Sequence, residues 1–92
     1  MNNARWRKLI ILLNDASQKD KLDALLQFFL TIEEQEQLAD RIALIQALLK
    51  GDKPQRQIAK ELNVSIAKIT RGSNMLKTSD KKLKAYLQEE LC

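Results

Sequence analysis

The chain has no histidine and a single cysteine, Cys92, at its end. Without histidine, neither a catalytic triad nor a Cys–His pair can form, and a structural zinc site lacks its usual ligands. A single cysteine also excludes a disulfide within the chain. The sequence therefore predicts a protein that is not an enzyme and binds no metal, with Cys92 as an exposed tail residue.

Glycine, proline and aromatic residues are scarce: the 92 residues include two Gly, one Pro, two Phe, one Trp and one Tyr. Leucine, isoleucine, alanine, lysine, glutamine and glutamate are abundant instead, which is typical of an all-α fold. No apolar run reaches membrane-spanning length and no cleavable signal pattern precedes the domain, so a soluble cytoplasmic protein is expected. The length predicts a single domain, residues 1–92, small enough to need a partner for stability.

The stretch from Gln55 to Lys77 has the pattern of two helices joined by a tight turn. In the first of these helices, Ile58, Ala59 and Leu62 share one face. The small Ala59 side chain allows another helix to cross closely at that point. This pattern predicts a helix-turn-helix over about residues 55–77.

The turn and the second helix of this unit show matching local signals. Asn63 tolerates the left-handed conformation that ends a helix, and Val64 can pack between the two helices. The Ser65 hydroxyl is expected to cap the second helix by accepting from a backbone N–H two or three residues later. Ile66 and Ile69 are expected to face the first helix.

The second helix carries polar and basic side chains on its outer face: Lys68, Thr70, Arg71, Ser73, Asn74 and Lys77. Residues 52–77 contain six basic and two acidic residues, a net charge of +4 that equals the net charge of the whole chain. This excess suits the neutralisation of phosphates, and the second helix of such a unit enters the DNA major groove. The alternative is an ordinary helical hairpin with a solvated basic face.

Four further helices are expected, over residues 4–17, 22–30, 32–50 and 81–91. Their predicted inward residues are Leu22, Leu25, Leu26 and Phe29 in the second helix, Leu38, Ile42, Ile45 and Leu49 in the third, and Leu83, Tyr86, Leu87 and Leu91 in the last. The first helix contains Leu9–Leu13, LIILL, whose apolar side chains surround the helix because successive residues are rotated by about 100°. One partner helix cannot cover them all, which favours an intertwined homodimer with a core from about 4–50 and 80–91. The alternative is that the domain covers this helix internally.

Helix ends are marked by local signals. Thr31 and Glu34 form a capping box that starts the third helix at Ile32, and Gly51 ends that helix after Lys50. Pro54 is expected in the first turn of the next helix. The last helix is expected to be capped by Ser79 or Asp80.

The run ITRGSNMLK from Ile69 to Lys77 resembles the signature of the bacterial Trp repressor family. Residues FFLT at 28–31, Arg41, LLKG at 48–51 and Gln55–Arg56 also match without gaps, so the resemblance covers nearly the whole chain. It implies a six-helix, interlocked dimer that binds operator DNA when L-tryptophan is bound. The chain begins almost at its first helix, without the arm that some members carry, so a lower non-specific DNA affinity is expected.

The resemblance also implies a ligand site. Arg41 and Arg71 match the two arginines that stack on the indole faces, and Arg71 also binds the ligand carboxylate. Thr31 matches the hydroxyl that assists Arg71, and the Phe28 and Leu30 carbonyls match the acceptors for the ammonium. The alternative is that Arg71 contacts only phosphate and Arg41 pairs with an acidic residue of its own helix.

Two further positions complete the implied ligand site. Gly72 matches the small residue that lets the indole lie against the second helix of the helix-turn-helix. Met75 replaces the usual serine near the ammonium, which removes one hydrogen-bonding group and leaves open whether L-tryptophan or a related indole compound is the effector.

The DNA-contacting residues implied by the resemblance, with neighbouring basic residues, are Gln55, Arg56, Lys60, Ile66, Ala67, Lys68, Thr70 and Lys77. Lys68 replaces a usual threonine near the base edges. Ala59 stands where the family has a lysine, with Lys60 adjacent, so the operator sequence is expected to differ.

The sequence thus predicts a repressor of trp and aromatic amino-acid biosynthesis genes that needs L-tryptophan and binds palindromic operator DNA. One alternative is a tryptophan-independent regulator or a replication-initiator-type DNA-binding domain. Another, from a different class, is a helical dimerisation module.

Overall fold

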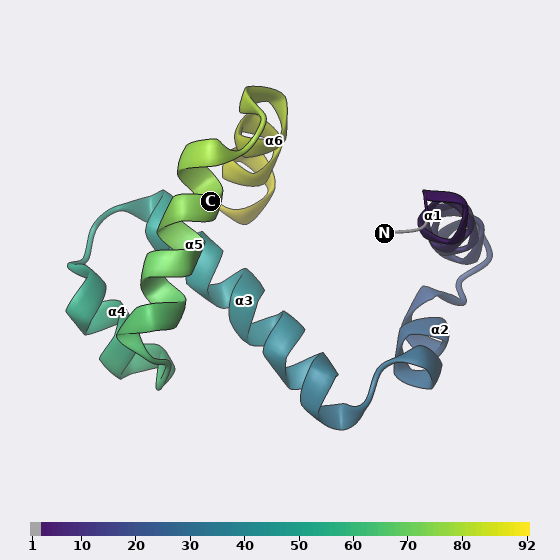
Figure 1. The fold of residues 1–92 in the computed structure, drawn as a ribbon, viewed down its shortest axis with the longest axis horizontal. Coiled ribbons are helices and arrows are strands. Elements are labelled where there is room, and N and C mark those ends of the chain that lie inside the picture. The colour runs from purple at the N-terminus through teal and green to yellow at the C-terminus, as the bar shows by residue number, and fades with distance from the viewer. Residues whose placement is uncertain (1–2) are drawn as a thin grey trace. The chain divides into compact units, whose positions relative to one another are not determined.

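A computed structural model describes residues 3–92 of the chain, and this part contains six α-helices and no strand. The helices are α1 (Asn3–Gln18), α2 (Leu22–Phe29), α3 (Ile32–Lys50), α4 (Gln55–Leu62), α5 (Ile66–Thr78) and α6 (Lys81–Leu91) (Figure 1). The predicted all-α, six-helix class is confirmed. The chain divides into two compact units, one that extends to Glu36 and one that comprises Gln37–Cys92, and each is described by itself.

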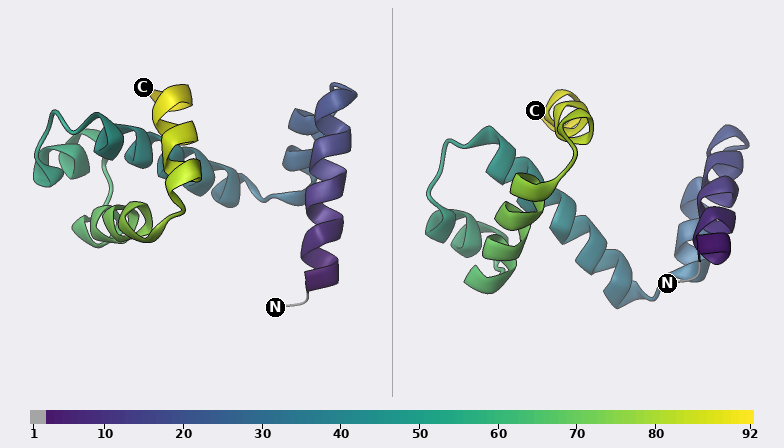
Figure 2. Two further views of the ribbon diagram at one scale, coloured as in Figure 1. Left: turned by 90° about the horizontal axis from the view of Figure 1, so that it is seen from above. Right: turned by 45° about the horizontal axis from the view of Figure 1, so that its top comes forward.

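In the first unit, α1 and α2 pack side by side (Figure 2). Between them Asp20 has a positive φ of 55°, and the Lys21 amide donates to the Ala16 carbonyl at 2.8 Å. Ala16, near the end of α1, is buried in this unit. The predicted polar break between the two helices is therefore confirmed.

The first unit leaves most of its apolar surface uncovered. In α1, Ile11 is 63% exposed and Leu12 is 39% exposed, while Leu13 is half-buried. In α2, Phe29 was expected to point inward but is 60% exposed, because α1 covers only the side formed by the half-buried leucines. The exposed large apolar residues of this unit are Trp6, Leu9, Ile10, Ile11, Leu12, Phe28, Phe29 and Ile32.

The second unit has a small apolar core to which α3, α4 and α5 contribute. Its buried members are Leu44, Ile45, Ile58, Ala59 and Ile69. Half-buried residues around them include Val64 from the turn and Leu87 and Leu91 from α6. The small Ala59 lies where α4 packs on α5, as its size predicted.

The predicted inward stripe of α3 was partly wrong. Ile45 is buried as expected, but Leu44 is its buried neighbour, and Leu38 and Ile42 are exposed. The stripe is set by the side of α3 on which α5 lies, and that side comprises Leu44, Ile45 and Leu48. The helical spacing of apolar residues could not identify this side, because apolar residues occur on several faces of α3.

Two other burial predictions need correction. Ile66 was expected to face α4 but is 48% exposed, because it lies in the first turn of α5, whereas Ile69, one turn later, is fully buried. In α6, Leu83 and Tyr86 were expected inward but are exposed, and only Leu87 and Leu91 contact the core. The C-terminal end of α6 is held to α3 by the Gln46 side-chain amide, which donates to the Leu91 carbonyl at 2.6 Å.

Several predicted helix ends are confirmed. Thr31 and Glu34 form the reciprocal capping box, with the Thr31 amide donating to the Glu34 carboxylate at 2.9 Å and the Glu34 amide to the Thr31 hydroxyl at 3.0 Å. Gly51 follows α3 with a positive φ of 65°, a conformation that favours glycine.

Two other helix starts differ from the prediction. Pro54 precedes α4 as its N-cap, with φ −63° and ψ 152°, instead of lying in the first turn. Its carbonyl nevertheless accepts from the Gln57 and Ile58 amides of the first turn of α4, both at 3.1 Å. At α6, Asp80 occupies the N-cap without a side-chain capping bond, and the Ser79 hydroxyl donates backwards to the Leu76 carbonyl at 2.9 Å.

The contrast between Ile69 and Ile66 gives a test of this core. Ile69→Ala should lower the free energy of unfolding by about 2–5 kcal/mol, because it leaves a cavity in a fully buried site. Ile66→Ala, on the same helix and half exposed, should cost much less. Chemical denaturation of both variants measures the difference, and equal losses would contradict the packing described here.

Candidate functional site

The predicted helix-turn-helix is present, formed by α4, the turn at Asn63 and Val64, and α5. Asn63 adopts the left-handed conformation, with φ 54° and ψ 47°. The Val64 amide donates to the Ala59 carbonyl at 3.0 Å, which closes the end of α4. The Ser65 hydroxyl accepts from the Lys68 amide at 3.2 Å and caps α5 as predicted.

All side chains expected at the DNA are exposed: Gln55, Arg56, Lys60, Ile66, Ala67, Lys68, Thr70 and Lys77. Four of them, Gln55, Arg56, Lys60 and Ile66, line one open depression of about 500 Å³ between the two helices. Ala59 and Val64 also line this depression. A surface with two basic groups and an apolar centre is thus presented by α4 and the first turn of α5.

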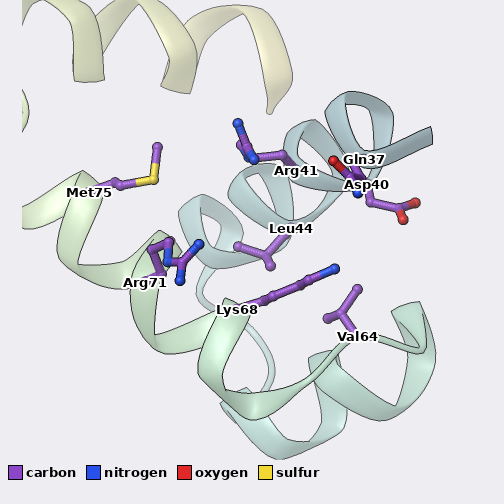
Figure 3. A pocket seen from close by; sticks show the side chains of 9 residues that line it. Gln37, Asp40, Arg41, Leu44, Val64, Lys68, Arg71 and Met75 are labelled. Atoms are coloured by element: carbon purple, nitrogen blue, oxygen red, sulfur yellow. The ribbon is translucent and has the colours of Figure 1, made fainter. Parts of the chain in front are cut away.

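A second hollow, of about 240 Å³, lies between α3 and α5 (Figure 3). It brings together Arg41, Arg71, Gly72 and Met75, four of the seven residues expected at the ligand. Arg41 comes from α3 and Arg71 from α5, so the two guanidinium groups belong to different walls of the pocket (Figure 3).

The charges of this pocket are not neutralised by ion pairs within the described residues. The two ion pairs found there, Lys19–Asp15 and Lys53–Glu61, involve neither Arg41 nor Arg71. The alternative in which Arg41 pairs with an acidic residue of α3 is therefore not realised in this structure. Both arginines are exposed and available to a ligand.

Gly72 has a structural role that the resemblance did not imply. A Cβ atom at this position would lie 2.4 Å from Leu44 Cδ2 and 3.4 Å from Leu48 Cδ1. Such a distance is well inside van der Waals contact, so the missing side chain lets α5 approach α3 closely. Gly72 therefore shapes the floor of the pocket as well as the contact between the helices.

Five other residues line the pocket that the sequence did not assign to it: Gln37, Asp40, Leu44, Val64 and Lys68. Lys68 was expected only at the DNA, yet its side chain extends from α5 along the pocket (Figure 3). The α3 residues 37, 40, 41 and 44 have the spacing of one helix face. This spacing could have shown from the sequence that the other three lie beside Arg41. Asp40 is the acidic residue among those that line the pocket.

The remaining expected ligand residues, Phe28, Leu30 and Thr31, belong to the first unit. They lie at the end of α2 and the start of α3, where backbone carbonyls lack helical partners. The Leu30 carbonyl accepts from the Gln35 side-chain amide at 3.1 Å. The Thr31 oxygen accepts from Glu34, so its hydroxyl hydrogen remains available as a donor.

Residues 4–91 match the family described as "Trp repressor protein". The chain belongs to the Trp repressor family. It is 42% identical over 86 residues to a "Trp operon repressor homolog" of Chlamydia trachomatis serovar L2, an alignment that covers 94% of this chain and 92% of the relative.

Relatives with the same description occur in other bacteria. One from Aliivibrio salmonicida is 41% identical over 94% of this chain and 80% of its own length. One from Vibrio cholerae is 39% identical over 96% of this chain and 85% of its own length. Members of the Trp repressor family are DNA-binding transcription regulators and not enzymes, so this chain is a non-enzymatic, DNA-binding regulator.

Within residues 3–92, no helix is both long and apolar enough to cross a membrane. The same residues contain no group of three or more His, Cys, Asp or Glu side chains that could hold a metal ion.

The close approach at Gly72 can be tested by adding one methyl group. Gly72→Ala gains about 1 kcal/mol of helix propensity, but overpacking against Leu44 costs about 1–3 kcal/mol, so a net loss of about 1 kcal/mol in stability is expected. Ser73→Ala, the next residue of α5, serves as a control. A Gly72→Ala variant more stable than the parent in denaturant would contradict the close contact between α5 and α3.

Proposed function

We propose that this protein is a tryptophan-dependent repressor whose dimer binds palindromic operator DNA of trp and aromatic amino-acid biosynthesis genes. The observation that carries the proposal is the pocket between α3 and α5, which both Arg41 and Arg71 line. The name of the similar proteins, "Trp operon repressor homolog", agrees with it.

The pocket has the chemistry that a zwitterionic indole amino acid requires. Two planar guanidinium groups can stack on the two faces of the indole, and Arg71 can also pair with the carboxylate. Its volume of about 240 Å³ lies below the range of about 300–1,000 Å³ typical of drug-sized ligands, which suits a single amino acid.

For the ammonium of the ligand, we propose an acceptor that the resemblance does not imply. Met75 offers no strong hydrogen-bond acceptor, whereas Asp40 contributes a carboxylate to the same pocket. We assign Asp40 as a counter-charge for the ammonium, while the Phe28 and Leu30 carbonyls remain acceptors that only the resemblance implies. For Thr31, the resemblance implies a hydroxyl that assists Arg71 at the ligand carboxylate.

Ligand and DNA are coupled through α5 in this proposal. Arg71 contacts the ligand, while Thr70 and Lys77 of the same helix face the DNA. A ligand shifts the population of DNA-competent dimers only by its differential affinity for that state, and DNA must then tighten ligand binding by the same factor. Tryptophan wedged between α3 and α5 would favour the orientation of α5 that fits the groove.

The homodimer follows from the apolar surface of the first unit. This unit exposes more large apolar side chains than a soluble monomer usually does, because α2 covers only one side of α1. A second copy of the chain is the partner that the resemblance implies. Helix-turn-helix dimers, Trp repressors among them, place their two recognition helices in successive major grooves of a palindromic site.

A titration of labelled operator-like DNA with and without L-tryptophan tests the proposal, and Arg71→Leu sharpens it. Arg71→Leu should lose tryptophan affinity by about 2–5 kcal/mol, the range for breaking a desolvated charge pair, and should lose tryptophan-dependent DNA binding with it. The dimer should remain folded, because the Arg71 side chain is exposed. Calorimetry measures the ligand affinity.

Arg56→Leu is the matched control for this experiment. It removes the same type of side chain from the DNA-facing depression and should weaken DNA binding while leaving tryptophan binding intact. If Arg71→Leu binds L-tryptophan as tightly as the parent, the ligand site is misplaced. DNA binding that ignores tryptophan would instead indicate a constitutive regulator, and no salt-dependent DNA binding would indicate a dimerisation module.

The dimer is tested separately by Leu12→Asp. An unpaired charge in the proposed interface costs several kcal/mol, of the order of the total stability, so folding and dimerisation should both be lost. Asn14→Asp, two residues later on the same helix, should leave both intact. Sedimentation and circular dichroism report the outcomes, and a folded monomeric parent at micromolar concentration would exclude the dimer.

A further inference from the structure

A third cavity in the second unit is surrounded by lysines from three different segments. It measures about 330 Å³ and is bordered by Lys53 from the loop before α4, Lys77 from α5 and Lys84 from α6. No acidic residue lines it. Neither the sequence patterns nor the family resemblance pointed to Lys84 or to α6 as a binding element.

The three lysines are not equivalent. Lys53 pairs with Glu61 at 2.8 Å, and the Gln57 side-chain amide donates to the same carboxylate at 3.1 Å. The hydrogen bond to Glu61 and its charge raise the pKa of Lys53. This pair ties the loop before α4 to α4 itself and thereby orders one edge of the cavity.

Lys77 and Lys84 have no such partner. Within residues 3–92, no carboxylate lies within 4.0 Å of either ammonium group, since the ion pairs found there involve other lysines. Two positive charges from α5 and α6 thus border one cavity without neutralisation. Unpaired ammonium groups at the border of one cavity attract an anion to it.

The position of the cavity identifies the anion. Gln55 at the start of α4 also lines it, and both Gln55 and Lys77 are residues that we expect at the DNA. The cavity therefore continues the proposed DNA surface toward α6. The Ser73 hydroxyl, also at its edge, supplies a further hydrogen-bond donor.

We propose that this cavity binds a backbone phosphate of the duplex and that Lys84 of α6 is a phosphate-contacting residue. The inference rests on the DNA binding proposed above and extends it to an element outside the helix-turn-helix. A phosphate held by Lys77 and Lys84 would dock α5 and α6 on the same strand. Such a contact fixes the register of the protein on DNA and carries no sequence information of its own.

The test is the salt dependence of DNA binding by Lys84→Ala. Losing one phosphate contact should lower the slope of log K against log salt by about 1, equally on operator and random duplexes. Between 50 and 200 mM salt, the parent should then lose about three- to fourfold more affinity than the variant. Lys84→Arg, which keeps the charge, should behave like the parent.

Lys82→Ala is the matched control, because it removes the same charge from an exposed position of α6 that does not border the cavity. Its slope should stay close to that of the parent. A separate titration with inorganic phosphate alone shows whether the cavity binds free phosphate. The NMR chemical shifts of the backbone amides around residues 77 and 84 report this binding.

The outcomes separate the two proposals. If the parent binds DNA but Lys84→Ala and Lys82→Ala give the same slope of log K against log salt, the proposed phosphate site is wrong. The DNA-binding function is then unaffected. If inorganic phosphate at millimolar concentration fills the cavity and Lys84→Ala leaves the DNA slope unchanged, the site takes free anion and not DNA. A parent that binds no duplex DNA overturns both proposals.

Discussion

The close approach of α5 to α3 at Gly72 is the contact on which the rest of the second unit depends. A Cβ atom at this position would lie 2.4 Å from Leu44 Cδ2, so any larger residue would force the Leu44 side chain or the helices to shift. Ile69, one turn earlier in α5, is then fully buried in the core. The same contact places Arg71 of α5 in one pocket with Arg41 of α3, because each arginine lies within one turn of the contact point.

One helix, α5, therefore serves three surfaces at once. Successive residues of a helix are rotated by about 100°, so Ile69, Thr70 and Arg71 point toward the core, the solvent and the pocket in turn. Anything that displaces α5 against α3 changes the pocket and the exposed face together. In the function that we propose, this connection would couple a ligand in the pocket to DNA on the exposed face.

Positive charge is spread over more of the surface than the helix-turn-helix alone. The depression between α4 and α5 contains Arg56 and Lys60, and the cavity near α6 contains Lys77 and Lys84. Lys68, by contrast, borders the pocket with Arg71 and not either of these surfaces. Lys68 therefore adds a further basic side chain to the pocket between α3 and α5.

Local signals in the sequence determined the helices, several of their ends and the resemblance to the family. The capping box at Thr31, the left-handed Asn63 and the Ser65 cap depend on hydrogen bonds between residues at most a few positions apart. The motif around Arg71 and Gly72 likewise lies in one short run. Such interactions are decided by neighbouring residues, so a sequence is enough to predict them.

Only the tertiary structure decided which faces are covered. Ile66 and Ile42 are as apolar as Ile69 and Ile45, and their exposure follows from where α5 crosses its neighbours. The grouping of Asp40 with Lys68, and of Lys84 with Lys77, also depends on contacts between separate helices. Burial and juxtaposition are set by the path of the whole chain, which no local pattern encodes.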